Sequence, residues 1–347
     1  MLSLRAVSAE LGVFRLRDVS LDVPRGDYCC VIGPTGAGKT VLLECVTGLH
    51  PVTSGAIRIA GEDVTSLPPE RRPLGYVPQD YALFPHMNVF DNMAYGLVEH
   101  RVPRQEARRR VGAVAELLNI GHLLSRRPAN LSGGEAQRTA LGRALVLRRE
   151  LLLMDEPFGA LDQTTKRELV HYLKTIHRDL GLTVLHITHD FAEAYGLATM
   201  VGVLLDGRLC QVAPPQEVFA RPATREVAEF LGIRNIWRLS ELGERAEGFL
   251  AAARDGARHG RIEDDSLCLT PDAIAVLPLG ADVDSQLAGE AILCEAHWQG
   301  AAWDLELDAG LAFHARLSSR EFAALAARPG DAVLASASPH NVHWIAD

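Results

Sequence analysis

One stretch, Cys29 to Thr40, limits the possible folds of this chain more than any other. It reads Cys-Cys-Val-Ile-Gly-Pro-Thr-Gly-Ala-Gly-Lys-Thr, a short apolar run that breaks into glycines. The pattern predicts a strand, a phosphate-binding loop and the first turn of a helix. Glycines let backbone N–H groups approach phosphate oxygens, and the start of the helix adds attraction for an anion. In this context the pattern G-x-x-x-x-G-K-T is far more specific than a lone glycine motif.

Each part of this loop has an expected partner. Lys39 should reach the β- and γ-phosphates of ATP, and the Thr40 hydroxyl should bind Mg2+. The residues expected to bind the nucleotide here are Gly33, Pro34, Thr35, Gly36, Ala37, Gly38, Lys39 and Thr40. Taken alone, the loop would suit a kinase, a GTPase, a helicase or a transport ATPase, so the other motifs must decide.

The length and charge of the chain limit the kind of protein that it can be. With 347 residues it is long enough for two domains with substantial cores. The formal net charge of -9 argues against a protein that binds nucleic acid through a general basic surface. Five arginines between Arg101 and Arg110 indicate a solvated helix face rather than a local basic patch.

Hydropathy and cysteine usage indicate where the chain works. It contains no run of 18 or more apolar residues and no signal-peptide core, so we expect no membrane crossing by the chain itself. The six cysteines lie scattered in apolar segments without metal-type spacing. They predict reduced, buried thiols in a cytosolic protein.

The order of strand and helix patterns predicts an α/β fold. Short alternating runs from Leu2 to Val31 indicate a small β-layer before the loop, and Leu151–Met154 suits a strand buried on both faces of a parallel sheet. From Gln79 to about Arg143 apolar residues recur at helical spacing, which predicts a helical insertion over about 80–143. Further predicted strands are Leu74–Val77, Thr183–Thr188, Met200–Leu205 and Arg208–Val212, and further predicted helices are Thr164–Leu180 and Phe191–Leu197.

The pattern changes again after about Gly232. Short alternating runs separated by glycines predict a second, small, all-β and barrel-like domain. We therefore expect a nucleotide-binding domain over 1–232 and a separate small domain over 233–347.

Asp155 and Glu156 end the apolar run at the carboxyl edge of the predicted sheet, where ligands of α/β proteins bind. Asp155 is expected to hold Mg2+ through water, and Glu156 to polarise the attacking water as a general base, a role that contributes about 10²- to 10⁴-fold in rate. The alternative is a capped strand end with two solvated acids.

The segment Leu131-Ser-Gly-Gly-Glu-Ala-Gln-Arg138 predicts a second phosphate site. Ser132 can cap a helix whose first N–H groups, at Gly133 and Gly134, face an anion. One ATP does not need two such sites in one chain, so this site should close over the ATP of another copy. The alternative is an ordinary helix start.

Together these motifs resemble those of ATP-binding-cassette (ABC) transporter ATPases, in the family's order and over roughly residues 1 to 232. The motifs are the phosphate loop Gly33 to Thr40, the Gln79 loop, the signature Leu131 to Arg138, Asp155-Glu156, the loop Gly159 to Asp162 and His189. The implied fold is an α/β phosphate-loop (P-loop) NTPase cassette with a helical insertion, followed by a small all-β domain.

The resemblance implies roles for three further residues. His189 contacts the γ-phosphate and helps to hold the attacking water. Asp162 communicates across the dimer. Gln79 senses Mg2+ and the γ-phosphate and relays closure to the helical insertion, which docks a membrane partner. The expected catalytic residues are thus Glu156, His189, Gln79 and Lys39, and the expected metal-binding residues are Thr40, Gln79 and Asp155.

Two departures from the family pattern stand out. Glu135-Ala136 replaces the two glutamines that many importers carry, which should leave the Ser132 and Gly134 contacts intact. The aromatic residue that usually stacks on adenine is absent near Leu11. Phe14 is the nearest substitute, although its alternating neighbours equally suit a core residue.

The phosphate loop and the segment Arg72 to Val89 resemble the molybdate/tungstate branch of importers, and the tail resembles the oligonucleotide-binding-like TOBE domain of importer ATPases. Such a domain can dimerise or can bind an oxyanion as a brake. Ser318 and Ser319, beside Arg316 and Arg320, offer donors for an oxyanion, and the alternative is a solvated turn.

The resulting expectation is a homodimeric ATPase subunit of an importer, peripheral on the cytoplasmic face of the membrane. It would bind ATP and Mg2+, drive two permease subunits, and serve a periplasmic or extracellular solute-binding protein indirectly. Ferric iron, sulfate, polyamine or sugar are alternative solutes. The acidic charge opposes a soluble ABC ATPase that acts on nucleic acid or ribosomes, and Lys39, Glu156 and His189 oppose a purely regulatory anion sensor.

Overall fold

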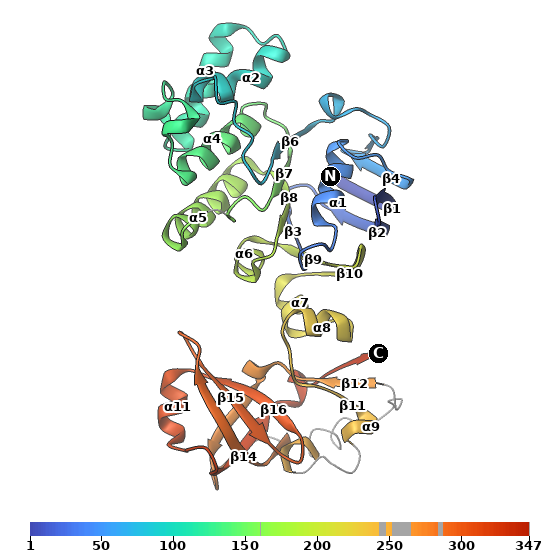
Figure 1. Cartoon of the computed structure of the whole chain (residues 1–347), viewed down its shortest axis with the longest axis vertical. Helices are drawn as coiled ribbons and strands as arrows, with labels where there is room; N and C mark the ends of the chain where they lie inside the picture. The colour runs from blue at the N-terminus through green and yellow to red at the C-terminus, as the bar shows by residue number, and fades with distance from the viewer. Residues whose placement is uncertain (160, 243–247, 252–264, 284–286, 347) are drawn as a thin grey trace. The chain divides into compact units, whose positions relative to one another are not determined.

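The computed structural model describes residues 1–159, 161–242, 248–251, 265–283 and 287–346. The chain divides into two compact units, Met1–Pro215 and Gln216–Asp347, and each is described by itself (Figure 1). This division falls before the boundary that we expected at residue 232. Two short helices, α7 (Pro215–Ala220) and α8 (Arg225–Phe230), precede residue 232, and Ala228 of α8 packs against Ile233 in an apolar cluster of the second unit.

A six-stranded sheet with strand order β10-β9-β3-β8-β7-β6 forms the centre of the first unit. Its strands are β3 (Tyr28–Ile32), β6 (Leu74–Val77), β7 (Leu151–Asp155), β8 (Thr183–Thr188), β9 (Met200–Leu205) and β10 (Arg208–Ala213). Neighbouring strands are parallel except β10, which runs antiparallel to β9. Every residue of β3, β7 and β8 is buried, which explains their largely apolar sequences.

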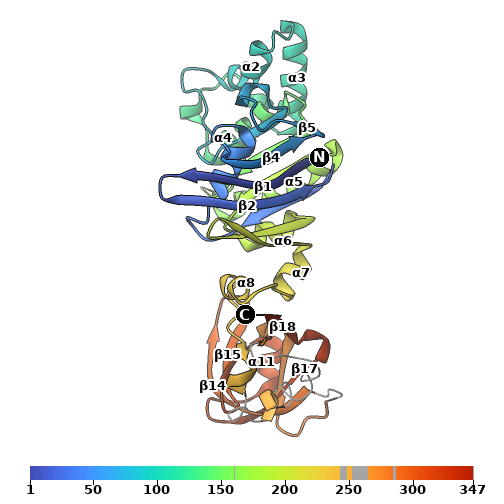
Figure 2. The same cartoon turned by 90° about the vertical axis from the view of Figure 1, so that its right-hand side faces the viewer.

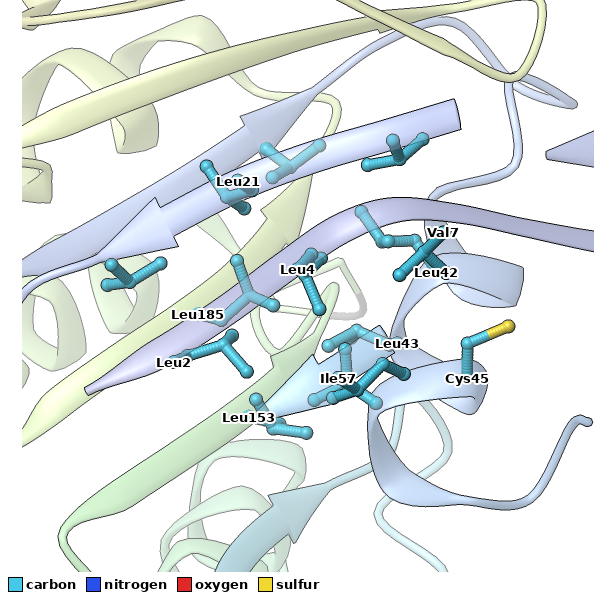
Figure 3. Packing of buried hydrophobic residues seen from close by; sticks show 14 of the residues in the cluster. Leu2, Leu4, Val7, Leu21, Leu42, Leu43, Cys45, Ile57, Leu153 and Leu185 are labelled. Carbon is cyan, nitrogen blue, oxygen red and sulfur yellow. The ribbon is translucent and has the colours of Figure 1, made fainter. Parts of the chain in front are cut away.

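A second sheet, of order β2-β1-β4-β5, forms the β-layer that the N-terminal pattern predicted (Figure 2). Its strands are β1 (Leu2–Leu11), β2 (Phe14–Val23), β4 (Ser54–Ile59) and β5 (Glu62–Asp63). Helix α1 (Lys39–Thr47) packs between the two sheets. Figure 3 shows Leu42 and Leu43 of α1 among Leu2, Leu4, Leu153 and Leu185 of the two sheets. This core fixes the start of α1, and with it the phosphate-binding loop.

The predicted helical segment contains α2 (Val89–Glu99), α3 (Arg104–Leu117) and α4 (Gly133–Leu145) (Figure 1). Two later helices, α5 (Gln163–Leu180) and α6 (Phe191–Leu197), flank β8 in the chain. The remaining short helices of the described chain are 3-10 turns at Pro69–Arg71, Gly121–Leu123, Pro128–Asn130, Pro271–Ala273 and Pro339–Asn341. None of the helices in the described ranges has both the length and the hydropathy that a membrane crossing needs.

The second unit is an antiparallel β half-barrel, as the alternating pattern predicted. Its five-stranded sheet contains β13 (Ile274–Pro278), β17 (Ala332–Ala337), β14 (Leu287–Trp298), β15 (Trp303–Asp308) and β16 (Ala312–Leu317), in that spatial order. A three-stranded sheet contains β11 (Ile236–Arg238), β12 (Asp265–Cys268) and β18 (His343–Ala346). Helices α9 (Leu239–Leu242) and α11 (Ser319–Leu325) also lie in this unit.

Two of the four candidate oxyanion donors in this unit, Ser318 and Arg316, already contact carboxylates of the chain. Ser318 caps α11, and both its N–H and its hydroxyl donate to Glu321 Oε2, at 2.8 Å and 2.6 Å. The Arg316 guanidinium pairs with Asp304 at 2.7 Å and lies 3.7 Å from Asp272. Ser318 thus belongs to a capped helix start, whereas Ser319 and Arg320 are exposed.

Four of the six cysteines are buried, as predicted, namely Cys29, Cys30, Cys45 and Cys268. The prediction is wrong for Cys294, which is exposed, and Cys210 is only half-buried. Both lie on antiparallel strands of which one face is accessible to solvent.

Candidate active site

The phosphate-binding loop joins β3 to α1 at the carboxyl end of the parallel strands. A Cβ at Gly33 would lie 2.2 Å from the Leu204 carbonyl oxygen, so only glycine fits there. Gly38, which directly precedes α1, has a φ of 97°, in the region that favours glycine. The loop thus needs glycine at Gly33 for close packing, and at Gly36 (φ 86°) and Gly38 for its backbone conformation.

Lys39 folds back over the loop. Its Nζ donates to the carbonyl oxygens of Gly33 at 2.7 Å and Pro34 at 3.0 Å, and the residue is only 6% exposed. Burial lowers the pKa of Lys39, while the negative charges of Glu156 and Asp155 oppose that shift. An anion that enters the loop therefore meets a fixed positive charge at the start of a helix.

A cavity of about 520 Å³ opens beside the loop. It collects side chains that are far apart in the sequence, from β2, the phosphate loop, the loop after β6, and the ends of β7 and β8. The lining residues are Phe14, Thr35, Gly36, Gly38, Lys39, Thr40, Val41, Gln79, Glu156 and His189. All the residues that we expected to be catalytic thus share one cavity.

The sequence left open whether Phe14 lies at the nucleotide site or in the core. Phe14 lines the cavity, and it also packs against the core between the two sheets. A Cβ at Gly38 would lie 2.2 Å from Phe14 Cζ, so the ring covers that glycine closely. The Phe14 ring therefore packs against the phosphate loop on the side of the loop that faces the cavity.

Asp155 lies behind the cavity and is only 3% exposed. Burial, followed by the charge of Glu156, raises its pKa to about 6, while the Thr40 hydroxyl and Lys39 favour the charged form. Its Oδ1 atom has no hydrogen-bond partner in the described structure. A buried oxygen without a partner is costly unless another group binds it, so Asp155 Oδ1 is an acceptor that a ligand could use.

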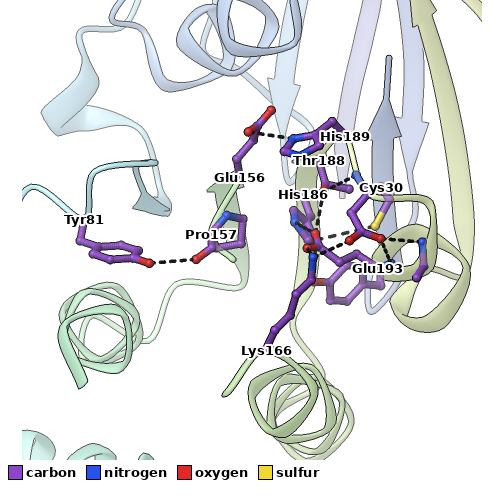
Figure 4. A network of polar contacts seen from close by, with 12 residues as sticks. Cys30, Tyr81, Glu156, Pro157, Lys166, His186, Thr188, His189 and Glu193 are labelled. Carbon is purple, nitrogen blue, oxygen red and sulfur yellow. Dashed lines mark hydrogen bonds and ion pairs between the residues drawn. The ribbon is translucent and has the colours of Figure 1, made fainter. Parts of the chain in front are cut away.

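Glu156 and His189 form a contact at the ends of adjacent strands (Figure 4). His189 Nδ1 lies 3.0 Å from Glu156 Oε2. Glu156 has a φ of 41°, and its N–H donates to the Ile187 carbonyl oxygen at 2.9 Å. The turn after β7 is therefore tied to β8, and it holds a carboxylate beside an imidazole at the cavity.

The loop that carries Gln79 is held by a residue that the sequence did not single out. The Arg143 guanidinium, on α4, donates to the carbonyl oxygens of Tyr81 at 2.8 Å and Ala82 at 2.6 Å. Both loop residues have positive φ, 61° and 41°. The Tyr81 hydroxyl also donates to the Pro157 carbonyl oxygen at 3.4 Å (Figure 4). The Gln79 loop is thus tied to both α4 and the turn that contains Glu156.

Ser132 caps α4 as expected, and Glu135 takes part in the cap. Ser132 N–H donates to Glu135 Oε2 at 2.7 Å, and Glu135 N–H donates to Ser132 Oγ at 3.3 Å. This reciprocal capping box gives the departure at Glu135 a structural role. Ser132, Gly133 and Gly134 all lie in the described chain and are not among the residues that line the cavity.

Asp162 is placed at the start of α5, also away from the cavity lining. Its carboxylate accepts the N–H groups of Thr164 at 3.0 Å and Thr165 at 3.1 Å. Hydrogen bonds from Thr165 lower the pKa of Asp162. The preceding loop was predicted as Gly159 to Asp162, and its Ala160 lies outside the described residues.

A glycine-rich loop between a parallel strand and a helix, with a lysine folded into it and two carboxylates at the next strand end, defines a phosphate-loop nucleotide-binding ATPase domain. Residues 16–159 match the protein family described as ABC transporter. The "Molybdate/tungstate import ATP-binding protein WtpC" of Thermococcus kodakarensis is 52% identical over 236 residues, which cover 68% of this chain and 72% of that protein. The chain belongs to the ABC transporter family, as an ATP-binding ATPase.

Other relatives extend the similarity. The "Spermidine/putrescine import ATP-binding protein PotA" of Rubrobacter xylanophilus is 37% identical over an alignment that covers 95% of this chain and 89% of that protein. Among solved structures, cbiO1 of Clostridium perfringens has a TM-score of 0.57 at 26% identity, over 63% of this chain and 90% of that chain. The dimeric ABC transporter cassette MJ0796 has the same TM-score and identity, over 62% of this chain and 99% of that chain.

Proposed function

We propose that the chain is the ATP-hydrolysing subunit of an importer, in which hydrolysis drives solute uptake through membrane permease subunits. The observation that carries this proposal is the shared cavity of Lys39, Glu156, His189 and Gln79 beside the phosphate loop. An ammonium group, a carboxylate and an imidazole meet there around backbone suited to phosphates. Phosphoryl transfer depends mainly on such positioning and charge stabilisation.

The roles follow from the chemistry of each group. Lys39 binds the β- and γ-phosphates, while Glu156 accepts a proton from the attacking water. His189, 3.0 Å from Glu156 Oε2, holds that water and the γ-phosphate in line with the carboxylate. Gln79 senses the γ-phosphate from the loop across the cavity, and the Phe14 ring offers a face for adenine.

Mg2+ fits the residues at the base of the cavity. Asp155 Oδ1 is buried without a partner, and the hydroxyl of Thr40 favours the charged form of this carboxyl. In the described chain no group of three or more His, Cys, Asp or Glu side chains could hold a metal ion, which suits an ion bound through substrate phosphates as well. Thr40, Asp155 and Gln79 are the proposed ligands, and the ion supplies positive charge to the phosphate oxygens.

Two chains are proposed to complete each other's sites. Ser132, Gly133 and Gly134 form a capped helix start suited to a phosphate, yet they lie away from the cavity of their own chain. A second copy that brings this helix start over the γ-phosphate would enclose two ATP molecules between the chains. Asp162 would face the interface, and similarity to a dimeric cassette supports this arrangement.

The permease partners are proposed to dock on the helical segment. A groove of about 730 Å³ between α2 and α3 is lined in part by the exposed apolar residues Tyr95 and Val98. Exposed apolar surface of this kind suits a protein partner. The chain would then work as a peripheral subunit on the cytoplasmic face of the membrane, and a periplasmic or extracellular binding protein would deliver the solute. No nucleic-acid partner is proposed.

Molybdate or tungstate is the proposed solute, because five relatives 48–52% identical are named for their import. Those matches cover 64–68% of this chain. Polyamine is the second candidate, because a relative named for spermidine/putrescine import matches 95% of the chain. We propose a dimerising or regulatory role for the C-terminal unit.

The test of the proposed function is the Glu156→Gln variant. In the purified full chain we expect ATP hydrolysis to fall by about 10²- to 10⁴-fold, because the general base is lost, while ATP binding is retained. In cells, the same variant should abolish molybdate and tungstate uptake and leave polyamine uptake unchanged. Hydrolysis at the wild-type rate would exclude the proposed role of Glu156. Loss of polyamine uptake alone would mean that polyamine, and not molybdate or tungstate, is the transported solute.

A further inference from the structure

Buried polar groups hold the two residues on either side of His189 (Figure 4). The Thr188 hydroxyl donates to Glu193 Oε2 at 2.6 Å and accepts the Asp190 N–H at 3.0 Å. Asp190 Oδ1 in turn accepts the first N–H groups of α6, from Ala192 at 2.7 Å and Glu193 at 3.2 Å. The backbone at His189 therefore depends on where Asp190 and Glu193 lie.

Lys166 joins these two carboxylates from a different helix. Its Nζ lies 2.5 Å from Asp190 Oδ2 and 2.5 Å from Glu193 Oε1. The Lys166 side chain is 16% exposed and that of Glu193 4%. Lys166 lies in the first turn of α5, where the helix dipole disfavours a positive charge. The two carboxylates, rather than α5 itself, account for a lysine at this position.

His186, the other basic group beside Glu193, does not share this role. It is fully buried, and burial followed by the charge of Lys166 lowers its pKa to about 3. His186 is therefore neutral at neutral pH, and its Nδ1 lies 3.1 Å from the Tyr28 hydroxyl. Without Lys166, Asp190 and Glu193 would repel each other in a partly buried site.

Lys166 also lies close to the start of α5. Its N–H donates to the Asp162 carbonyl oxygen at 2.9 Å, so one helical turn separates Lys166 from the cap of the helix. Asp162 is the residue proposed to face the second copy of the chain. One turn of α5 thus joins the Asp162 cap to the ion pairs that Lys166 makes with Asp190 and Glu193.

We propose that Lys166 is a positioning residue that fixes the loop of His189 through Asp190 and Glu193 and connects it to the start of α5. The proposal rests on the proposed function, because it concerns the same site. Lys166 is not among the residues that line the cavity beside the phosphate loop. It sets the place of the imidazole, and closure of the dimer at Asp162 acts on His189 through it.

The first test compares Lys166→Met with Lys166→Arg in the full chain. Lys166→Met should lower kcat for ATP hydrolysis by about tenfold or more, because small misplacements of a catalytic group are costly, and should leave KM for ATP nearly unchanged. Lys166→Arg, which keeps the charge, should restore most of kcat. The matched control is Lys174→Met, an exposed lysine on the same helix, which should behave as wild type.

A second variant covers the case in which Lys166→Met does not fold. Asp190→Asn keeps an oxygen to cap α6 but removes the ion pair, and it should also lower kcat with little change in KM. A spectroscopic readout is independent of activity. In chains with ¹³C-labelled histidine, the imidazole signal of His189, assigned by its loss in His189→Ala, should shift or broaden in Lys166→Met and Asp190→Asn but not in Lys174→Met.

The outcomes separate this proposal from the proposed function. A wild-type chain that does not hydrolyse ATP would overturn the proposed function, and the His189 signal would still decide the role of Lys166. An active wild type, with kcat unchanged and the His189 signal unmoved in folded Lys166→Met, would overturn the positioning role. A loss of activity through KM alone would overturn it as well.

Discussion

His186 lies in the centre of β8 with no exposed surface, and burial lowers the pKa of its imidazole to about 3. In the unfolded chain the same group has a pKa of about 6.5. Below that pH the unfolded chain takes up a proton that the folded chain does not. The free energy of unfolding of the first unit therefore depends on pH through the protonation of His186.

We expect the first unit to lose stability as the pH falls from about 6.5 toward 3, by up to about 1.4 kcal/mol per pH unit from His186. Above about pH 6.5 both states are neutral there, so the residue adds no pH dependence. His186→Gln should flatten this part of the profile. Urea unfolding followed by circular dichroism at several pH values measures the slope.

The chain offers two controls for that experiment. His171 on α5 is exposed, so His171→Gln should keep the wild-type slope. All four tryptophans, Trp237, Trp298, Trp303 and Trp344, lie in the second unit, so their fluorescence follows that unit separately. Equal slopes in wild type and His186→Gln would refute the assignment.

Single residues also show what the sequence could predict. The phosphate loop could be predicted because its residues are consecutive and their conformation is local, as Gly38 illustrates. Lys166 and Arg143 could not, because their contacts join segments 24 and 61 residues apart, and nothing in a helical sequence distinguishes them from surface cations. The one available signal was a lysine in the first turn of a helix, against the dipole.

Helices α2 and α4 hold the Gln79 loop in an unfavourable backbone conformation. Tyr81 and Ala82 both have positive φ, a conformation that costs about 1–3 kcal/mol each in residues other than glycine. Arg143 donates two hydrogen bonds that hold the loop in this shape. The Asn92 side chain adds two more, because it accepts from the Phe84 N–H and donates to the Phe84 carbonyl oxygen. Both helices that hold it, α2 and α4, belong to the helical segment.

We therefore expect Arg143→Lys to free the loop, because an ammonium group cannot reproduce the two parallel bonds of a guanidinium. ATP hydrolysis should fall by about tenfold through displacement of Gln79. Hydrogen exchange of the amides between residues 78 and 88 should become faster. The control is Arg109→Gln, an exposed arginine of α3. Hydrogen exchange and activity at the wild-type level in Arg143→Lys would show that the loop keeps its shape without the two guanidinium hydrogen bonds.

The elements that sequence patterns predicted well are those with long buried runs or strong caps. Strands β8 and β9 and helix α6 have the predicted bounds, because apolar runs and the Asp190 cap mark their ends. Helices α7 and α8 were missed, since six residues are too few to show a helical period.

In the whole molecule, the groups expected to surround one ATP do not all lie in one cavity. The cavity contains the phosphate loop and Glu156, whereas the capped start of α4 lies elsewhere in the same chain. If two chains complete each other, a defect in the phosphate loop of one chain and a defect in the α4 start of the other spoil the same site. The second site of such a pair stays intact.

We therefore expect two inactive chains to complement each other. In a Glu156→Gln background, which is expected to trap closed dimers, Lys39→Ala and Ser132→Glu should each prevent ATP-induced dimerisation. Lys39→Ala removes the cation for phosphate, and Ser132→Glu places a negative charge at the α4 start. When the two are mixed with ATP, unlike pairs should form and should make up nearly all of the pairs, because only an unlike pair keeps one intact site. Differently labelled chains allow unlike pairs to be counted by fluorescence energy transfer. Dimerisation of Ser132→Glu alone, or no unlike pairs under conditions that dimerise the parent chain, would mean that the α4 start does not complete the partner's site.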